Sequence, residues 1–283
     1  MTDNEDIPEP QPKPRRRRWP RVLGGLLLLM VVGMIVYGFI PGRTPAADPS
    51  LDSARHRVVA VFGASGTVGD GVLEALLADP GVQQIHVATR RTTSRIDEGV
   101  ARGTVEVHEH RDYADYAAIA DILPQVDAVY WALGTSAANV NDAEYSVIHV
   151  DYPLAFVRQW LEQAGEGERS FHLVTGQGSD EGSWQHWARE KARAEREIMA
   201  LARDSNIRVV AYRPTYVAPS GERARWWHDA VHAVFSPVDF ATRSTDIGRA
   251  MLEVSARGAS ELPHGTILEN KDLLEYAAVY RAR

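Results

Sequence analysis

The sequence of 283 residues contains no cysteine. Disulfides, thiolate nucleophiles and cysteine-ligated zinc sites are therefore excluded. The folded part also lacks an excess of positive charge. Of the 31 basic and 38 acidic side chains, seven and four lie in the first 43 residues, which leaves 24 basic against 34 acidic. Because nucleic-acid binding depends on Lys and Arg contacts to phosphates, we predict no nucleic-acid partner.

Charge is absent from residues 22–40, VLGGLLLLMVVGMIVYGFI. At ~1.5 Å per residue a helix of this length spans roughly 28 Å, close to the thickness of the hydrocarbon core of a bilayer. We therefore predict a transmembrane helix over 22–40, after a disordered basic N-terminus (1–21) and before a linker (41–57). The chain would be a single-pass membrane protein. The alternative is a cleavable signal peptide, with Thr44–Ala47 as the cleavage region.

The stretch Val58–Gly69, VVAVFGASGTVG, combines an apolar strand, three glycines and the start of a helix at Val72–Leu77. This order opens a βαβ unit that binds a dinucleotide. A pyrophosphate needs backbone N–H donors at close range, glycine permits that approach, and the helix N-terminus adds partial positive charge. Gly63, Gly66 and Gly69 are therefore predicted cofactor contacts. The alternative is a glycine turn without a ligand.

Downstream, apolar strands alternate with helical segments. Strands are predicted at 84–88, 104–107, 128–133, 171–174 and 207–212, and helices at 113–122, 142–163 and 185–203. From Glu222 on, the tail predicts two or three helices and a short strand at 266–268. Such alternation predicts one α/β domain over 58–283, a Rossmann-type doubly wound parallel sheet with a small C-terminal helical substrate region.

An acidic residue is missing where an NAD-selective site would place one, about twenty residues after the glycine loop. The second strand instead ends in Thr89, Arg90 and Arg91. Guanidinium groups bind a 2′-phosphate through forked, charge-assisted hydrogen bonds, so Arg90 and Arg91 predict NADP(H) rather than NAD. The alternative is a solvated basic turn.

The side of the membrane stays open at this point. Six basic residues precede the apolar span and only Arg43 closely follows it, which places the N-terminus in the cytoplasm and the folded domain outside. Nicotinamide cofactors are cytosolic, so this orientation conflicts with the glycine loop. Either Arg16–Trp19 acts as a twin-arginine export signal for a folded, cofactor-loaded protein, or the charge rule fails here.

Seven short motifs in order resemble the atypical short-chain dehydrogenase/reductases, in particular the NmrA-like branch related to the Tat-interacting oxidoreductase. They are GASGTVG, TRR, ALGTS (Ala132–Ser136), VDY (Val150–Tyr152), FHLVTGQGSD (Phe171–Asp180), YRPTYV (Tyr212–Val217) and LENK (Leu268–Lys271). The similarity runs from about Val58 to the end. It implies a Rossmann fold, NADPH binding, and cofactor contacts at Gly63, Ser65, Gly66, Thr67, Val68, Gly69, Arg90, Arg91, Leu133 and Gly134.

The catalytic tyrosine of that family is missing. Its Tyr-x-x-x-Lys pair uses the phenol as general acid, while the lysine lowers the phenol pKa and bonds the nicotinamide ribose. Here Lys191 is present, but Trp187 stands four residues before it. The resemblance implies Lys191 as a catalytic and cofactor-binding residue, with Thr175 in place of the family's serine. Alternatively, Lys191 is a solvated side chain.

Other side chains are candidates for the same pocket. Trp184, His186 and Trp187 could line it over the nicotinamide, with His186 as a conceivable acid. Tyr145 and Tyr152 are further phenols that could reach it, although core packing explains them equally well. Trp226, Trp227 and Phe235 could close the substrate side or rest near a membrane.

His228 and His232 lie one helical turn apart, as in a helical zinc site, with Asp229 where a metalloprotease has glutamate. The shorter Asp would misplace the general base and no third ligand is obvious, so we predict no metal site. Two functions remain. One is an NADP(H)-dependent oxidoreductase acting on a small-molecule substrate; the other is a regulatory or assembly protein that holds NADPH, acts on no substrate and contacts a protein partner.

Overall fold

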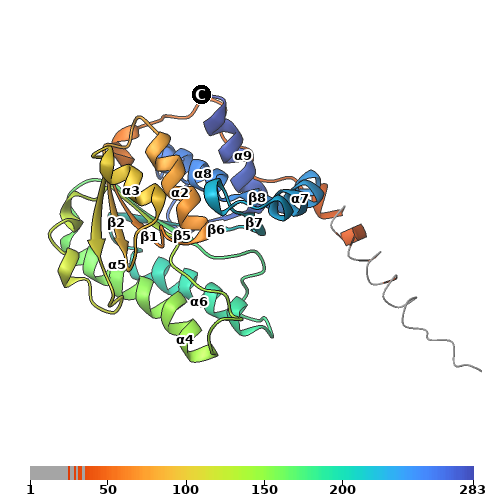
Figure 1. Ribbon diagram of the computed structural model, residues 1–283, viewed down its shortest axis with the longest axis horizontal. Helices are drawn as coiled ribbons and strands as arrows, with labels where there is room; N and C mark the ends of the chain where they lie inside the picture. The colour runs from red at the N-terminus through yellow and green to blue at the C-terminus, as the bar shows by residue number, and fades with distance from the viewer. Residues whose placement is uncertain (1–24, 26–28, 30, 34–35) are drawn as a thin grey trace, which may run out of the picture.

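The computed structural model describes residues 25, 29, 31–33 and 36–283 (Figure 1). The predicted basic segment 1–21 and nine of the nineteen residues of the predicted span 22–40 lie outside the described residues. Among the residues that are described, no helix is both long enough and apolar enough to cross a membrane.

Seven strands form one sheet in the order β3-β2-β1-β4-β5-β6-β9, and every neighbouring pair is parallel. The order reverses between β1 and β4, which makes a crevice at the carboxyl ends of these two strands. β7 and β8 pair separately. The strands are β1 Val58–Phe62, β2 Gln84–Thr89, β3 Val105–Glu109, β4 Ala128–Trp131, β5 Arg169–Val174, β6 Ile207–Arg213, β7 Tyr216–Ala218, β8 Ala241–Arg243 and β9 Thr266–Glu269.

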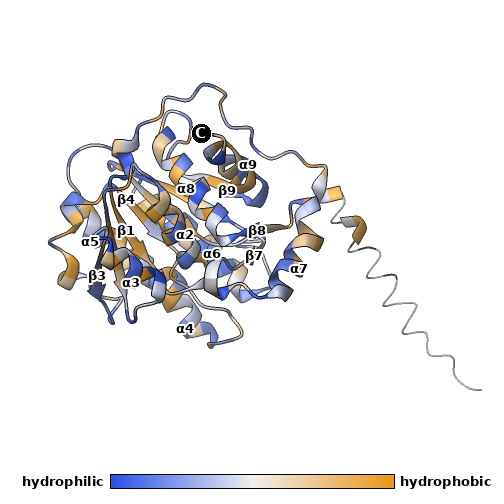
Figure 2. Cartoon of the chain, turned by 45° about the horizontal axis from the view of Figure 1, so that its top comes forward, coloured by the Kyte–Doolittle hydropathy of each residue, from blue (hydrophilic) through white to orange (hydrophobic). Residues whose placement is uncertain are grey.

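Helices cover both faces of the sheet. One apolar core lies between the sheet and α2, α3, α8 and α9, and a second lies on the side of α5 and α6. Figure 2 shows hydrophobic residues concentrated on the strands and on the helix sides that face them. The helices are α2 Thr67–Ala78, α3 Ser94–Ala101, α4 Asp142–Ser146, α5 Tyr152–Gln163, α6 His186–Leu201, α7 Trp226–Phe235, α8 Ser244–Arg257 and α9 Asn270–Arg281. The predicted α/β parallel sheet is confirmed.

The helix predicted at 113–122 is wrong. Short 3-10 turns stand there instead, at Ala117–Ile119 and Leu123–Gln125. The Asp112 and Asp115 carboxylates accept hydrogen bonds from the backbone N–H groups two residues on, at 3.0 and 2.9 Å. Such local bonds compete with helical ones and favour turns.

The helix α3 was missed by sequence. Its N-cap is Thr93, whose hydroxyl accepts from the Ile96 N–H at 3.5 Å. The predicted helix 142–163 is continuous but contains a π-helical turn at Val147–Asp151 between α4 and α5. A π turn adds a residue to the helical repeat and so redirects the side chains around it.

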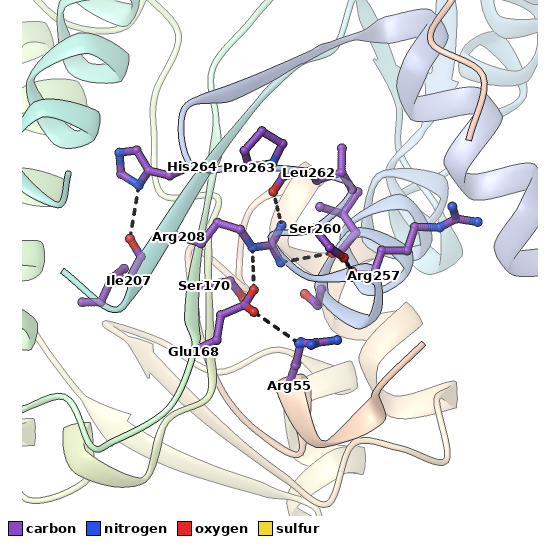
Figure 3. Close-up of polar contacts among 12 residues, drawn as sticks. Arg55, Glu168, Ser170, Ile207, Arg208, Arg257, Ser260, Leu262, Pro263 and His264 are labelled. Atoms are coloured by element: carbon purple, nitrogen blue, oxygen red, sulfur yellow. Dashed lines mark hydrogen bonds and ion pairs between the residues drawn. The ribbon is translucent and has the colours of Figure 1, made fainter. Parts of the chain in front are cut away.

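The segment predicted as a linker packs against the domain. The Arg55 guanidinium donates to the Ala256 carbonyl at 3.0 Å and lies 3.5 Å from Glu168. Glu168 also binds the Nε of Arg208 at 3.0 Å, and the buried Arg208 donates to the carbonyls of Leu262 and Val254 (Figure 3). Arg208 therefore joins the start of β6 to the end of α8.

Candidate functional site

A cavity of about 620 Å³ lies at the carboxyl ends of the central strands. Loops that follow β1, β4, β5 and β6 surround it, so it occupies the crevice where the strand order reverses. The lining residues are Gly66, Thr67, Val68, Ala132, Leu133, Gly134, Thr135, Ser136, His149, Val174, Thr175, Gly176, Gln177, Gly178, Trp187, Lys191, Pro214, Thr215, Val217 and Phe240.

The loop after β1 can be built only with glycine. Gly63 has a φ of 83°, and a Cβ there would lie 2.5 Å from the carbonyl carbon of Ala132. A Cβ on Gly69 would lie 2.1 Å from the carbonyl oxygen of Gly63. The Gly66 N–H donates to that same oxygen at 2.8 Å, which closes the loop. Gly63 and Gly69 therefore shape the loop, while Gly66 lines the cavity.

The N-terminus of α2 faces the cavity through Gly66, Thr67 and Val68. Its N-cap is Gly66, and no side chain caps the first turn. Free backbone N–H groups and the positive end of the helix dipole are thus available to an anion. The neighbouring Ser65 carbonyl accepts from the Arg223 guanidinium at 2.6 Å. Sequence reasoning missed Arg223, because it lies in the weakly patterned tail.

Leu133 and Gly134 line the opposite wall. A Cβ on Gly134 would lie 2.7 Å from the His149 ring, so this histidine packs directly on the β4 loop. Its Nε2 lies 3.0 Å from the Thr135 carbonyl and 3.2 Å from the Thr135 backbone N. Burial, assisted by the charge of Lys191, lowers the pKa of His149 to about 4, so it is neutral at physiological pH. His149 was missed, because only its position near the π turn brings it into the cavity.

Arg90 and Arg91 extend from the end of β2, the strand beside β1, and both side chains are exposed. The Thr89 hydroxyl donates to the Arg91 carbonyl at 2.7 Å and fixes the turn. Within residues 36–283, neither guanidinium forms an ion pair. They do not line the cavity, so their role toward a 2′-phosphate stays a prediction.

Lys191 reaches the cavity from α6. Its Nζ donates to the Thr175 carbonyl at 2.5 Å. The Thr175 hydroxyl points elsewhere and donates to buried Glu195 at 2.5 Å. Glu195 in turn holds Arg213 through two hydrogen bonds, at 2.9 and 2.5 Å. Thr175 therefore connects the cavity wall to a buried ion pair, and in this geometry its hydroxyl proton is not offered to a ligand.

The Lys191 side chain is half-buried in the cavity wall. Burial lowers the pKa of Lys191 from its usual 10.5 to about 8, and the negative charge of Glu195 opposes part of that shift. Trp187, one helical turn earlier, also lines the cavity, as predicted. The position of the family's tyrosine is thus in the cavity and is filled by an indole.

The other weighed aromatic and histidine residues do not line the cavity. Trp184 is 87% exposed, and His186 bonds to the Asp142 carbonyl at 3.0 Å. Tyr145 stacks beneath His149, with ring centroids 4.1 Å apart, and Tyr152 packs against Tyr113. Trp226, Trp227 and Phe235 belong to α7, and Phe240, beyond that helix, contacts the cavity instead.

The two histidines of α7 do not form a metal site with a third ligand among the described residues. The Nδ1 of His228 accepts from the Arg225 N–H at 3.1 Å, so His228 caps the helix. Nothing in the described part of the chain supports the metalloprotease interpretation.

The segment before residue 41 reaches the cavity mouth. The Tyr37 hydroxyl donates to Gln177 at 3.2 Å, and its ring packs edge-on against Phe240 at 5.9 Å. The Lys271 ammonium donates to the carbonyls of Tyr37 and Ile40 and lies 4.7 Å from the Tyr37 ring centre. Both Gln177 and Phe240 line the cavity, so this segment borders its entrance.

A seven-stranded parallel sheet with a glycine loop and an uncapped helix at its switch point is typical of Rossmann-type dinucleotide-binding proteins. A family model described as NAD(P)H-binding matches residues 63–233. The chain belongs to this NAD(P)H-binding family.

Two curated fungal proteins are similar to the chain. "Protein fmp52-1, mitochondrial" of Aspergillus oryzae is 23% identical over 77% of this chain and 97% of its own length. "Protein fmp52, mitochondrial" of Emericella nidulans is 26% identical over 74% and 91%.

Solved structures share the fold at low identity. A short-chain dehydrogenase/reductase from Saccharomyces cerevisiae superimposes with a TM-score of 0.59 and 13% identity, over 78% of this chain and 99% of that one. The 3-oxoacyl-[acyl-carrier protein] reductase of Brucella melitensis, solved with NAD, gives 0.56 and 15%, over 78% and 98%. The family match confirms the predicted NAD(P)-binding domain, and these structures show that the chain shares the fold of the short-chain dehydrogenase/reductases.

Proposed function

We propose that the chain is an NADP(H)-dependent oxidoreductase that reduces a carbonyl compound, with Lys191 as the proton donor. One observation carries the proposal: an ammonium group whose pKa is lowered to about 8 projects into the cavity where the dinucleotide loop ends. A general acid works best when its pKa lies near the operating pH, and Lys191 meets that condition without a tyrosine.

The residues present fit a dinucleotide. At Gly63 and Gly69 any Cβ would collide with backbone atoms, so the loop packs without side chains. A ligand can therefore approach its backbone closely. The N-terminus of α2 has no side-chain cap, which leaves its donors for a pyrophosphate. Gly66, Thr67 and Val68 would hold the phosphates, and Leu133 and Gly134 would pass beside the adenosine ribose.

A nicotinamide cofactor held by these residues would supply the hydride that reduces the carbonyl carbon. As negative charge grows on the carbonyl oxygen, Lys191 Nζ transfers its proton there, so the product is an alcohol and the lysine is left neutral. The Thr175 carbonyl orients the ammonium, and the Glu195–Arg213 pair fixes Thr175. Trp187 covers this end of the cavity and limits water near the reacting groups.

Selectivity for the phosphorylated cofactor rests on Arg90 and Arg91. Both are exposed at the carboxyl end of β2, with no carboxylate partner in residues 36–283. Free guanidinium groups at this position suit a 2′-phosphate, and no acidic side chain follows β2 to repel it.

We further propose that residues 22–40 anchor the chain in a membrane and that the substrate is a small, apolar carbonyl compound. The contacts of Tyr37 with Gln177 and Phe240 support this, because they set the cavity mouth beside the end of the apolar segment. A substrate dissolved in a bilayer would then enter from the membrane side. The fungal relatives are named as mitochondrial, and a membrane-bound location is compatible with those names.

The test is turnover by the full-length chain reconstituted in vesicles, with NADPH and a panel of apolar aldehydes and ketones. Substrate-dependent NADPH oxidation, lost by a factor of about 100 or more in Lys191→Met, supports the proposal. Tight NADPH binding without oxidation of any panel member would overturn it.

That negative outcome would favour a second function, an NADPH-binding regulatory or assembly protein that binds a protein partner. The observations behind it are Trp187 in the position of the family's tyrosine and the engagement of the Thr175 hydroxyl with Glu195. The two functions differ in what Lys191→Met does. In a binding protein it changes NADPH affinity alone.

A further inference from the structure

A group of three potential ligands lies outside the cavity lining, on β2 and the edge strand β3. Among the residues that the structure describes, one set of three His, Asp or Glu side chains brings its ligand atoms within 4.8 Å of one another, namely His86, Glu106 and His108. Sequence reasoning predicted no metal site and did not weigh these residues, because no local spacing motif joins them.

Strand register explains the grouping. His86 on β2 is directly opposite Glu106 on β3, and His108 follows Glu106 by two residues. Residues two apart on a strand point to the same face, and those on a neighbouring strand stand about 5 Å away. The parallel pairing of β2 with β3 therefore places all three side chains on one face.

The distances between the ligand atoms fit a metal site. His86 Nδ1 lies 3.0 Å from His108 Nε2 and 3.5 Å from one carboxylate oxygen of Glu106. His108 Nε2 lies 3.8 Å from the other carboxylate oxygen of Glu106. The carboxylate distances are too long for hydrogen bonds. Two ligand atoms that each lie ~2.0–2.1 Å from a tetrahedral zinc ion are ~3.3 Å apart, and the three distances lie on either side of that value.

We propose that His86, His108 and Glu106 bind one divalent transition-metal ion of the zinc type. Two imidazoles and a carboxylate form a ligand set that zinc accepts with a water in the fourth position. Solvent reaches the site from the Glu106 side, since that side chain is 57% exposed and His86 only 7%. In Figure 2, β3 is a largely hydrophilic strand at the edge of the sheet.

The local electrostatics agree with this assignment. The negative charges of Glu106 and Asp121 both act on His86 and favour a cation here. The bound ion would link β2 to β3, which is an edge strand in the sheet that the described residues form.

The experiment measures binding of Zn²⁺ alone to the full-length, tag-free chain after removal of metal with a chelator. We expect one equivalent by elemental analysis and titration calorimetry. Glu106→Gln and His108→Gln should each weaken binding by a factor of about 10 to 100 or more. The matched control is the double variant His228→Ala/His232→Ala, which removes the other histidine pair and should leave stoichiometry and affinity unchanged.

Failure of the wild-type chain to take up zinc, or uptake that persists in Glu106→Gln and disappears in the α7 control, would overturn the proposal. NADPH binding, measured in parallel, reports whether each variant is folded. Because the metal ligands lie outside the cavity, zinc can bind whether or not the chain is an oxidoreductase. The two proposals therefore fail separately.

Discussion

Lys191 Nζ donates to the carbonyl oxygen of Thr175 across 2.5 Å, and the hydroxyl of the same threonine donates to Glu195 on the other side. One residue thus links an ammonium in the cavity to a buried ion pair. The lysine is held by backbone, so its position does not depend on a tyrosine, and its pKa depends on burial.

The first prediction concerns pH. If Lys191 is the acid, the rate of carbonyl reduction should be constant below pH 8 and fall about tenfold per pH unit above it, because only the protonated form donates. The oxidation of the alcohol should show the opposite dependence. Steady-state kcat between pH 6 and 10 measures both. In Lys191→Arg, the fall in kcat above pH 8 should disappear, since a guanidinium does not titrate in that range.

The same pKa can be measured without turnover. The chain has three lysines, Lys13, Lys191 and Lys271. An amine reacts with acylating reagents only when neutral, so Lys191 should reach half its maximal reactivity near pH 8 once corrected for access. Mass spectrometry of the acylated peptides separates the three sites. A titration midpoint near 10.5 would remove the basis for Lys191 as the acid.

The second prediction concerns cofactor selectivity. Arg90→Ala/Arg91→Ala should raise the Kd for NADPH by a factor of about 10 to 100 and leave the Kd for NADH nearly unchanged, because a charge-assisted hydrogen bond contributes about 1.5–3 kcal/mol. Fluorescence titration measures both constants. Arg102→Ala is the control, an exposed arginine at the end of α3. Equal losses for NADH and NADPH would contradict the 2′-phosphate assignment.

The third prediction concerns the glycine loop. Gly69→Ala should lower the free energy of unfolding by about 1–3 kcal/mol or more, because the new Cβ would meet the Gly63 carbonyl oxygen at 2.1 Å. Urea denaturation followed by circular dichroism measures it. Gly182→Ala is the control, since its Cβ would face only the Asp180 side chain at 3.3 Å. An unchanged midpoint for Gly69→Ala would show that the loop can shift.

The fourth prediction concerns Arg208. Arg208→Met should destabilise the fold by about 3 kcal/mol, because the carbonyls of Val254 and Leu262 and the Glu168 carboxylate lose a buried donor. Arg111→Met should change stability little, since Arg111 is 73% exposed. Thermal unfolding compares the two. Similar melting temperatures would mean that water replaces the lost donor.

The sequence predicted the sheet because its strands are continuous apolar runs that end at glycines, as at Val58–Phe62. It missed α3, whose signals are a capping Thr93 and few apolar residues, and it mistook 113–122 for a helix because aspartate turns carry no periodicity. In the cavity, the glycine loop was found by local spacing, and Lys191 by the resemblance to the family's Tyr-x-x-x-Lys pair. His149, Arg223 and Phe240 were not, since only tertiary contacts bring them there.

The hydrogen bonds from the Lys271 ammonium to the Tyr37 and Ile40 carbonyls bear on how the protein should be prepared. A chain shortened to begin at residue 41 would be the obvious choice for solubility. In it, Lys271 would lose two hydrogen-bond acceptors, and the side of the Phe240 ring that Tyr37 covers would be exposed to solvent. The entrance to the cavity would be wider and more accessible to water than in the full-length chain. A chain that begins near residue 36 retains these hydrogen bonds. The activities of the two shortened chains should therefore differ most with the bulkiest apolar substrates.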